Sequence, residues 1–182
     1  MLKPIIFVLA SIGIIAVSRR SLRDFRSHGF YRFFAIEFLV ILILLNANDW
    51  FSDPFSLAHV ASWLLLIGSF FLAVHGFHLL LIVGKPSGKD DGTATLGFEN
   101  TTTLVTVGAY RYIRHPLYGS LLLFGWGTFL KSVSFVTLAL IILVSGFLIA
   151  TAKAEEKENL QRFGIGYGTY TKKTKMFIPF FF

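Results

Sequence analysis

Five apolar segments dominate the sequence and leave little room for a soluble domain. They cover residues 4–17, 33–46, 57–83, 117–130 and 133–152. A helix that crosses a bilayer needs roughly 20 apolar residues, or somewhat fewer where its ends snorkel or the bilayer thins. The chain is 54% hydrophobic and its mean hydropathy is +0.68, which is far above the range of soluble domains. The sequence therefore predicts an all-α integral membrane protein of about five transmembrane helices, built as a single domain over residues 1–182.

The basic residues predict the orientation of this bundle. Of the 17 lysines and arginines, 15 fall in three polar segments, within residues 19–32, 85–114 and 153–175, and only Lys3 and Lys131 lie elsewhere. Connections rich in Lys and Arg stay in the cytoplasm. An odd number of spans places all three segments on one side, so we expect the N-terminus outside, the C-terminus in the cytoplasm, and a cofactor cleft on the cytoplasmic face.

Charge and cysteine content exclude several classes of function. The net charge of +7 is explained by membrane topology and attraction to anionic lipids, and no basic soluble domain is present that would bind nucleic acid. The chain has no cysteine, so thiol nucleophiles and thiolate metal sites are excluded. We expect membrane lipids as partners, no nucleic acid and no obligate protein partner.

Arg114, His115 and Pro116 stand where a long polar loop enters the fourth apolar segment. Proline suits the first turn of a helix, so this triplet predicts a helix N-terminus. Free backbone N–H groups and the positive end of the helix dipole attract an anion there, and an arginine adds a clamp for a carboxylate or phosphate. A basic anchor that snorkels to lipid headgroups explains the same triplet equally well.

Glu155 and Glu156 follow the fifth apolar segment, in a helix predicted to reach Phe163 and to end at Gly164. A solvated charged surface is the simpler explanation of such a pair. However, the short turn at residues 131–132 returns the fifth segment to the membrane face that carries Arg114 and His115. A cationic clamp and a carboxylate pair on opposite sides of one cleft are suited to a zwitterionic ligand.

Three other polar residues lie within or beside apolar segments. His75 and His78 are three residues apart on one predicted helix face, but the sequence clusters no carboxylates with them, so we expect no metal site. Glu37 lies in the second segment, where an ionisable side chain is a functional candidate by default. A simple pair with Arg32 at the membrane boundary is an equally good interpretation of Glu37.

The two polar motifs together resemble the isoprenylcysteine carboxyl methyltransferase and phospholipid methyltransferase families of integral membrane enzymes. The first is Leu104-Val-Thr-x-Gly108-x-Tyr110-Arg-Tyr-Ile-Arg114-His115-Pro116-x-Tyr118. The second, some forty residues on, is Glu155-Glu156 with Phe163-Gly164-x-x-Tyr167-x-x-Tyr170 and then Pro179. The resemblance covers the C-terminal half of the chain strongly and the first three segments only in general character.

This resemblance implies S-adenosylmethionine as the methyl donor, with S-adenosylhomocysteine as product, and a lipophilic acceptor that reaches the cleft from the bilayer. It implies a donor-binding region over about residues 101–182. The catalytic residues that it implies are Arg114, His115 and Glu155. The donor-binding residues that it implies are Leu104, Val105, Gly108, Tyr110, His115, Pro116, Tyr118, Glu155 and Glu156.

The chain departs from the family pattern at one position that bears on the acceptor. Many members carry an arginine one turn before the glutamate pair, whereas this chain has Thr151, with Lys153 nearby. The acceptor, a carboxylate or an amine of a prenylated or other lipid-like molecule, is therefore open. Two other functions are compatible with the sequence: an NADPH-dependent membrane oxidoreductase that resembles sterol reductases, and a non-catalytic membrane interaction protein.

Overall fold

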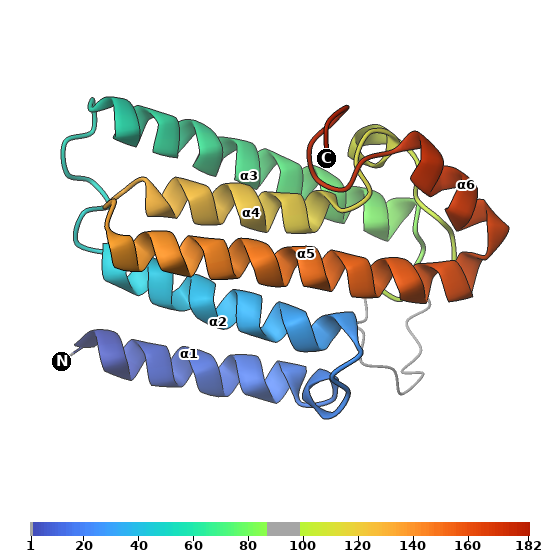
Figure 1. The fold of residues 1–182 in the computed structure, drawn as a ribbon, viewed down its shortest axis with the longest axis horizontal. Helices are drawn as coiled ribbons and strands as arrows, with labels where there is room; N and C mark the ends of the chain where they lie inside the picture. The colour runs from blue at the N-terminus through green and yellow to red at the C-terminus, as the bar shows by residue number, and fades with distance from the viewer. Residues whose placement is uncertain (1, 87–98) are drawn as a thin grey trace.

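The computed structural model describes residues 2–86 and 99–182, and within them the fold is entirely helical apart from two isolated β-bridges. Within these described residues, six α-helices and two short 3₁₀ turns follow one another. They are α1 (Leu2–Ser18), η1 (Ser21–Arg23), α2 (His28–Asn46), α3 (Leu57–Ile82), η2 (Gly108–Arg111), α4 (Pro116–Phe129), α5 (Phe135–Phe163) and α6 (Ile165–Lys173). The first five α-helices run side by side, and α6 turns back at one end of the bundle (Figure 1).

Local sequence signals explain where the helices begin. Ser27 and Ser56 cap α2 and α3 by accepting hydrogen bonds from the N–H groups of Phe30 and His59. Ser134 and Thr137 form a reciprocal capping box at the start of α5, which satisfies N–H groups that would otherwise lack partners. Pro116 stands in the first turn of α4, as its sequence position predicts.

Three helices are long and apolar enough to cross a membrane, namely α2, α3 and α5. Helix α1 is a shorter apolar helix of 17 residues. Helix α4 has 14 residues, a length of about 21 Å at 1.5 Å per residue, which is less than the hydrocarbon core of a bilayer. The prediction of a helical membrane protein is therefore confirmed, whereas five full spans and their orientation stay predictions.

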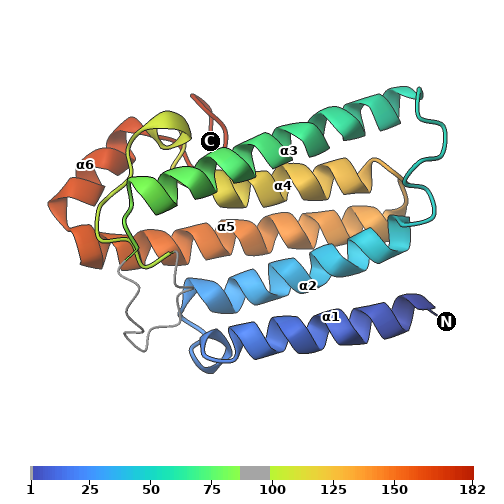
Figure 2. The same cartoon turned by 180° about the vertical axis from the view of Figure 1, so that it is seen from behind.

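The helices are ordered α1, α2, α5, α4, α3 across the bundle, and the same order is seen from behind (Figure 2). The buried core joins α2, α4 and α5 through side chains that include Leu42, Ile141, Val144 and Leu148, all fully buried. Helix α1 lies on the outside against α2 and has no buried residue. Lipid-facing apolar side chains are the normal outer surface of such a bundle.

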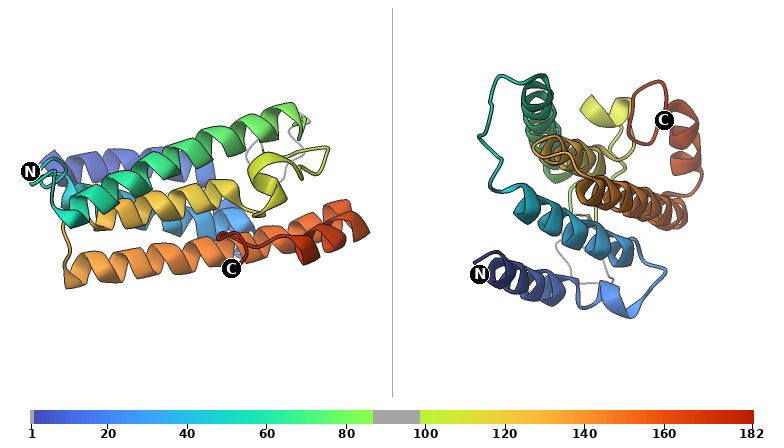
Figure 3. Two further views of the ribbon diagram at one scale, coloured as in Figure 1. Left: turned by 90° about the horizontal axis from the view of Figure 1, so that it is seen from above. Right: turned by 60° about the vertical axis from the view of Figure 1, so that its left-hand side comes forward.

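The ends of the bundle differ in character. One end carries the turn around Lys131 and the connection between α2 and α3. The other end carries η1, η2, α6 and the C-terminal tail (Figure 1), and the view from above shows η2 and α6 together at that end (Figure 3, left). We call this second end the polar end. The two polar motifs of the sequence therefore meet at one end of the fold, as the hairpin of α4 and α5 predicts.

Candidate functional site

A pocket at the polar end collects side chains from α3, the η2 loop, α4, α5 and α6. Seven of the residues predicted for the site line it: Leu104, Val105, Tyr110, Arg114, His115, Tyr118 and Glu155. The other residues that line it are Leu80, Glu99, Thr101, Leu117, Asn159, Phe163, Tyr167 and Tyr170. Gly108, Pro116 and Glu156, which were also predicted, are not part of the lining, although Glu156 contacts the lining residues Arg114 and His115.

Arg114 and His115 stand immediately before α4, where the C-terminal tail passes beside them. The N–H of Arg114 donates to Lys175 O at 2.8 Å, and the N–H of His115 donates to Met176 O at 3.3 Å. The guanidinium of Arg114 also donates to Thr174 O. Two of the backbone donors that were expected to receive an anion are thus used by the tail, so the tail is a structural part of the site.

The charged side chains that were expected on opposite sides of the cleft are in direct contact. Arg114 Nε donates to Glu156 Oε1 at 2.6 Å, and His115 Nε2 lies 3.3 Å from the same oxygen. His115 Nδ1 is 3.7 Å from Glu155 Oε2. The anionic and cationic ends of the predicted cleft form one ion-paired cluster in which His115 stands between the two carboxylates.

His115 is almost fully buried, with 4% of its surface exposed. Burial alone lowers the pKa of a histidine, but here the carboxylates of Glu155 and Glu156 outweigh burial and raise the pKa of His115 above its ordinary value. The ring stacks on Tyr118 with centroids 5.6 Å apart and an angle of 18°, and it contacts Phe177 of the tail at 6.2 Å. The two carboxylates therefore favour the protonated form of this imidazole, which lies between two aromatic rings.

Tyrosines form the side of the pocket toward α6. Tyr170 Oη donates to Tyr110 O at 2.6 Å, which ties α6 to the η2 turn. The Tyr167 hydroxyl is buried and has no hydrogen-bond partner among the described residues. Burial, assisted by the negative charge of Glu155, raises the pKa of Tyr110 well above its usual value, so this side of the pocket is neutral and aromatic.

A second charged cluster lies beside the pocket, and no motif in the sequence indicates it. His28, at the start of α2, contacts Glu158 through Nδ1 at 2.6 Å and Glu99 through Nε2 at 3.2 Å. Arg32 also pairs with Glu99. These residues are up to 130 positions apart. The packing of α2 against α5 brings His28 to Glu158, and the connection between α3 and η2 supplies Glu99. Glu99 connects this cluster to the pocket, because it is also one of the residues that line the pocket.

Gly108 and His75 support the pocket from outside. Gly108 has a φ of +59°, and a Cβ there would lie 2.5 Å from His75 Nε2. The same nitrogen accepts a hydrogen bond from the N–H of Ala109 at 3.2 Å, so His75 holds the η2 turn beside α3. Pro116 packs near Gly76 of α3.

Among the described residues, no group of three or more histidine or acidic side chains is arranged to hold a metal ion.

The structure gives contacts for Glu37 and Thr151, two residues whose roles the sequence alone leaves open. Glu37 accepts a hydrogen bond from Ser11 Oγ of α1 at 2.8 Å, and Arg32 turns to Glu99 instead, so the suggested pair of Glu37 with Arg32 is wrong. The two lie one and a half turns apart on α2 and cannot share a face. Thr151 is fully buried and donates to Phe147 O at 2.7 Å.

The fold and the site define a helical membrane protein with an ion-paired pocket at one end of its bundle. The sequence model of the phospholipid methyltransferase family matches residues 57–164, which include α3, α4, α5 and most of the pocket. The chain belongs to this family, a branch of the membrane methyltransferases that the two motifs resemble. Searches of curated proteins and of solved structures found no match.

Proposed function

We propose that the protein is an S-adenosylmethionine-dependent methyltransferase that acts on a lipophilic acceptor. The observation that carries the proposal is the position of His115 and Glu155 in one pocket at the polar end of a membrane bundle, within the matched family region. The family favours this function over an NADPH-dependent oxidoreductase. We further propose that residues 1–182 form one domain, with donor binding over about residues 101–182, and that the pocket faces the cytoplasm.

The chemistry of the pocket fits such a donor. The donor supplies a methyl group activated by a positively charged sulfur, next to an ammonium and a carboxylate. Glu155 and the rings of Tyr110 and Tyr118 suit the cationic groups, because carboxylates and aromatic faces attract cations. Arg114 and His115 suit the carboxylate, and the Tyr167 hydroxyl offers an uncommitted polar group.

In this proposal Arg114, His115 and Glu155 are the catalytic residues. The remaining donor contacts come from Leu104, Val105, Gly108, Tyr110, Pro116, Tyr118 and Glu156. The tail and α6 close the pocket on one side, which limits water and fixes the alignment that an in-line displacement requires. A carboxylate acceptor needs no base, whereas an amine must lose a proton. Because the two carboxylates favour the protonated form of His115, Glu155 is the better candidate for the proton acceptor in that case.

The acceptor side of the site differs from the family pattern at Thr151. Its hydroxyl is used within α5, so it presents no charge to an acceptor. Arg32 of α2 interacts electrostatically with Glu99, Tyr118 and Glu155. An arginine of a different helix thus acts electrostatically on this side of the pocket. An acceptor carboxylate and an acceptor amine both remain compatible with this arrangement.

Donor binding tests the proposal directly. We expect S-adenosylhomocysteine to bind the detergent-purified protein in calorimetry, and Glu155→Gln to weaken this binding by about tenfold or more, since a hydrogen bond to a charged group contributes roughly 1.5–3 kcal/mol. Asp49→Asn is the matched control, because it also neutralises a carboxylate but lies at the opposite end of the bundle. Tight binding of NADPH without any binding of S-adenosylhomocysteine would overturn the proposal.

The acceptor is identified by incubating the protein with labelled donor and a total lipid extract. We expect one labelled lipid product, which distinguishes O- from N-methylation. The His115→Ala protein should yield none while it is still expressed at normal levels. Cellular function that survives alanine at Arg114, His115 and Glu155 would instead indicate a non-catalytic membrane protein.

A further inference from the structure

We propose that a second cavity at the polar end binds the headgroup of an anionic phospholipid. This cavity lies between the linker that follows η1 and the last turns of α5. The linker and α2 supply Asp24, Arg26, Ser27 and Tyr31, and α5 supplies Ala150, Lys153, Ala154, Lys157, Glu158 and Gln161. None of these residues lines the first pocket, and neither the sequence motifs nor the proposed function uses the cavity.

The charges around the cavity favour an anion. Lys153 and Lys157 are four residues apart, so both project from one face of α5, and Arg26 faces them across the cavity. The two acidic side chains already have partners within the protein. Asp24 accepts from the N–H of Arg26 at 2.9 Å, and Glu158 is bound by the N–H and the ring of His28. Neither lysine forms an ion pair within the described residues.

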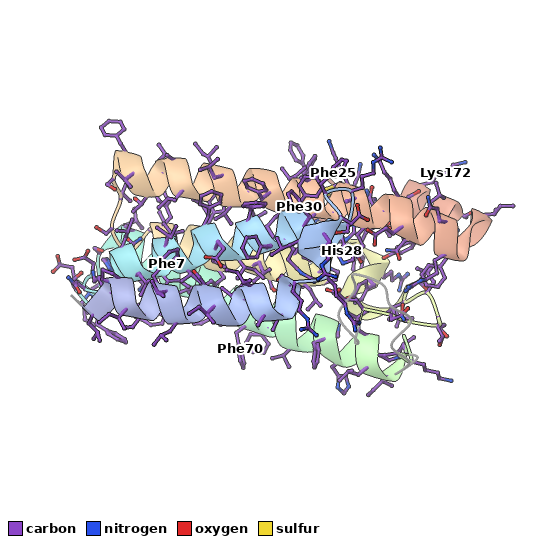
Figure 4. The ribbon with its side chains drawn as sticks, turned by 90° about the horizontal axis from the view of Figure 1, so that it is seen from below. Phe7, Phe25, His28, Phe30, Phe70 and Lys172 are labelled. Carbon is purple, nitrogen blue, oxygen red and sulfur yellow. The ribbon has the colours of Figure 1, made fainter. Side chains whose placement is uncertain are left out.

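The position of the cavity favours a lipid over a free anion. It lies where α2 begins and where the apolar part of α5 ends, which is the expected level of the lipid headgroups. Phe25 is 62% exposed beside it, and Figure 4 shows Phe25 and Phe30 next to α5. Further along α5, nothing lies within 4 Å of a Cβ built at Gly146. An acyl chain can therefore pass along this helix while its phosphate stays with the lysines.

The lipid site is separate from the first pocket, although the two are close. Glu158 lines the second cavity and Glu99 lines the first pocket. His28 lies between them, is only 2% exposed and contacts both carboxylates. A row of three contacting side chains, with the buried His28 at its centre, thus divides the two cavities, so a headgroup bound at Lys153 and Lys157 does not compete for the space beside His115.

Lipid retention measured by native mass spectrometry tests this proposal. The protein is incubated in detergent with equal amounts of phosphatidylglycerol and phosphatidylcholine. We expect the wild type to retain phosphatidylglycerol preferentially. The double variant K153Q/K157Q should lower that retention by about tenfold or more, because each lysine near a membrane surface attracts anionic lipid strongly. The matched control is K172Q/K173Q, which removes two exposed lysines from α6, away from the cavity (Figure 4).

A second variant tests the cavity without changing any charge. Ala150→Phe places a ring in the space beside Lys153, and we expect it to reduce phosphatidylglycerol retention as well. Equal losses in the two lysine double variants would show diffuse surface attraction and overturn the proposal. Binding of inorganic phosphate as strong as that of phosphatidylglycerol would overturn it in favour of a free anion. The measurement requires no methyl transfer, so its outcome is independent of the proposed function.

Discussion

At the scale of single residues, the site depends on how His115 is held. Its N–H is bound by the tail, its ring lies between Tyr118 and Phe177, and its nitrogens face two carboxylates. An imidazole buried without these carboxylates would be neutral, because burial disfavours the charged form. Glu155 and Glu156 thus favour the charged form of His115, a residue that is proposed to bind the donor.

This arrangement makes stability depend on pH in a defined direction. The pKa of His115 is higher in the folded protein than in the unfolded chain. The contribution of His115 to stability is therefore complete at pH values below 6.5, the ordinary pKa of histidine. This contribution is lost as the pH rises through the pKa that His115 has in the folded protein. We expect His115→Asn to lower the free energy of unfolding by about 2 kcal/mol at pH 6. The difference from wild type should shrink at alkaline pH.

Thermal unfolding followed by tryptophan fluorescence measures this difference across the pH range. The matched control is His78→Asn, which changes an exposed histidine of α3 and should show no such trend. A difference for His115→Asn that grows as the pH rises would contradict a protonated, ion-paired His115.

At the scale of elements, α3 and α4 form a tightly packed pair that carries the η2 loop and the start of α4. Ser62 Oγ donates to Gly127 O at 2.6 Å, and Ser69 Oγ donates to Ser120 O at 2.8 Å. Small residues let the two backbones approach closely enough for such bonds, which is a common device between helices in membranes. The position of Arg114 and His115 follows from this contact, because they directly precede α4.

Two glycines test the importance of this close approach. A Cβ at Gly127 would lie 3.0 Å from Leu66 Cγ and 3.1 Å from the backbone oxygen of Ser62. We expect Gly127→Ala to destabilise the protein by about 1–3 kcal/mol, the usual range for overpacking, and to lower its melting temperature by several degrees. Gly146→Ala is the matched control, because that helical glycine has no neighbour within 4 Å. It should be neutral or slightly stabilising. Equal effects would contradict the packing of α3 on α4.

The sequence predicts elements better than it predicts contacts between them. The helix through Glu155 that ends at Phe163 was predicted, and so was the start of α4 at Pro116, since each depends on local signals. The structure adds that the apolar and charged parts of this region form one continuous α5. The tail carbonyls beside Arg114 and the position of Glu99 beside His28 were not predicted. These contacts join residues about 60 to 70 positions apart, and no periodicity or spacing marks them.

At the scale of the whole molecule, the basic residues are distributed unevenly between the two ends of the helix bundle. Of the 15 basic residues in the three polar segments, those that the structure describes lie toward the polar end, together with the pocket and the lysine-lined cavity. The opposite end carries Lys131, whose ammonium is 3.9 Å from the ring of Trp63 and is buried without a hydrogen bond to the described residues. Apart from Lys3 at the start of α1, the basic residues that the structure describes outside the polar end therefore reduce to Lys131, which is enclosed.

The predicted orientation, with the polar end in the cytoplasm, can be tested with single cysteines, because the natural chain contains none. Ser52→Cys places a thiol in the exposed connection between α2 and α3, and Lys172→Cys places one on α6. Since basic connections are retained in the cytoplasm, a membrane-impermeant maleimide should label Ser52→Cys in intact cells. It should label Lys172→Cys only after permeabilisation. The reverse pattern would place the pocket and the lipid site outside the cell and would exclude a cytoplasmic methyl donor.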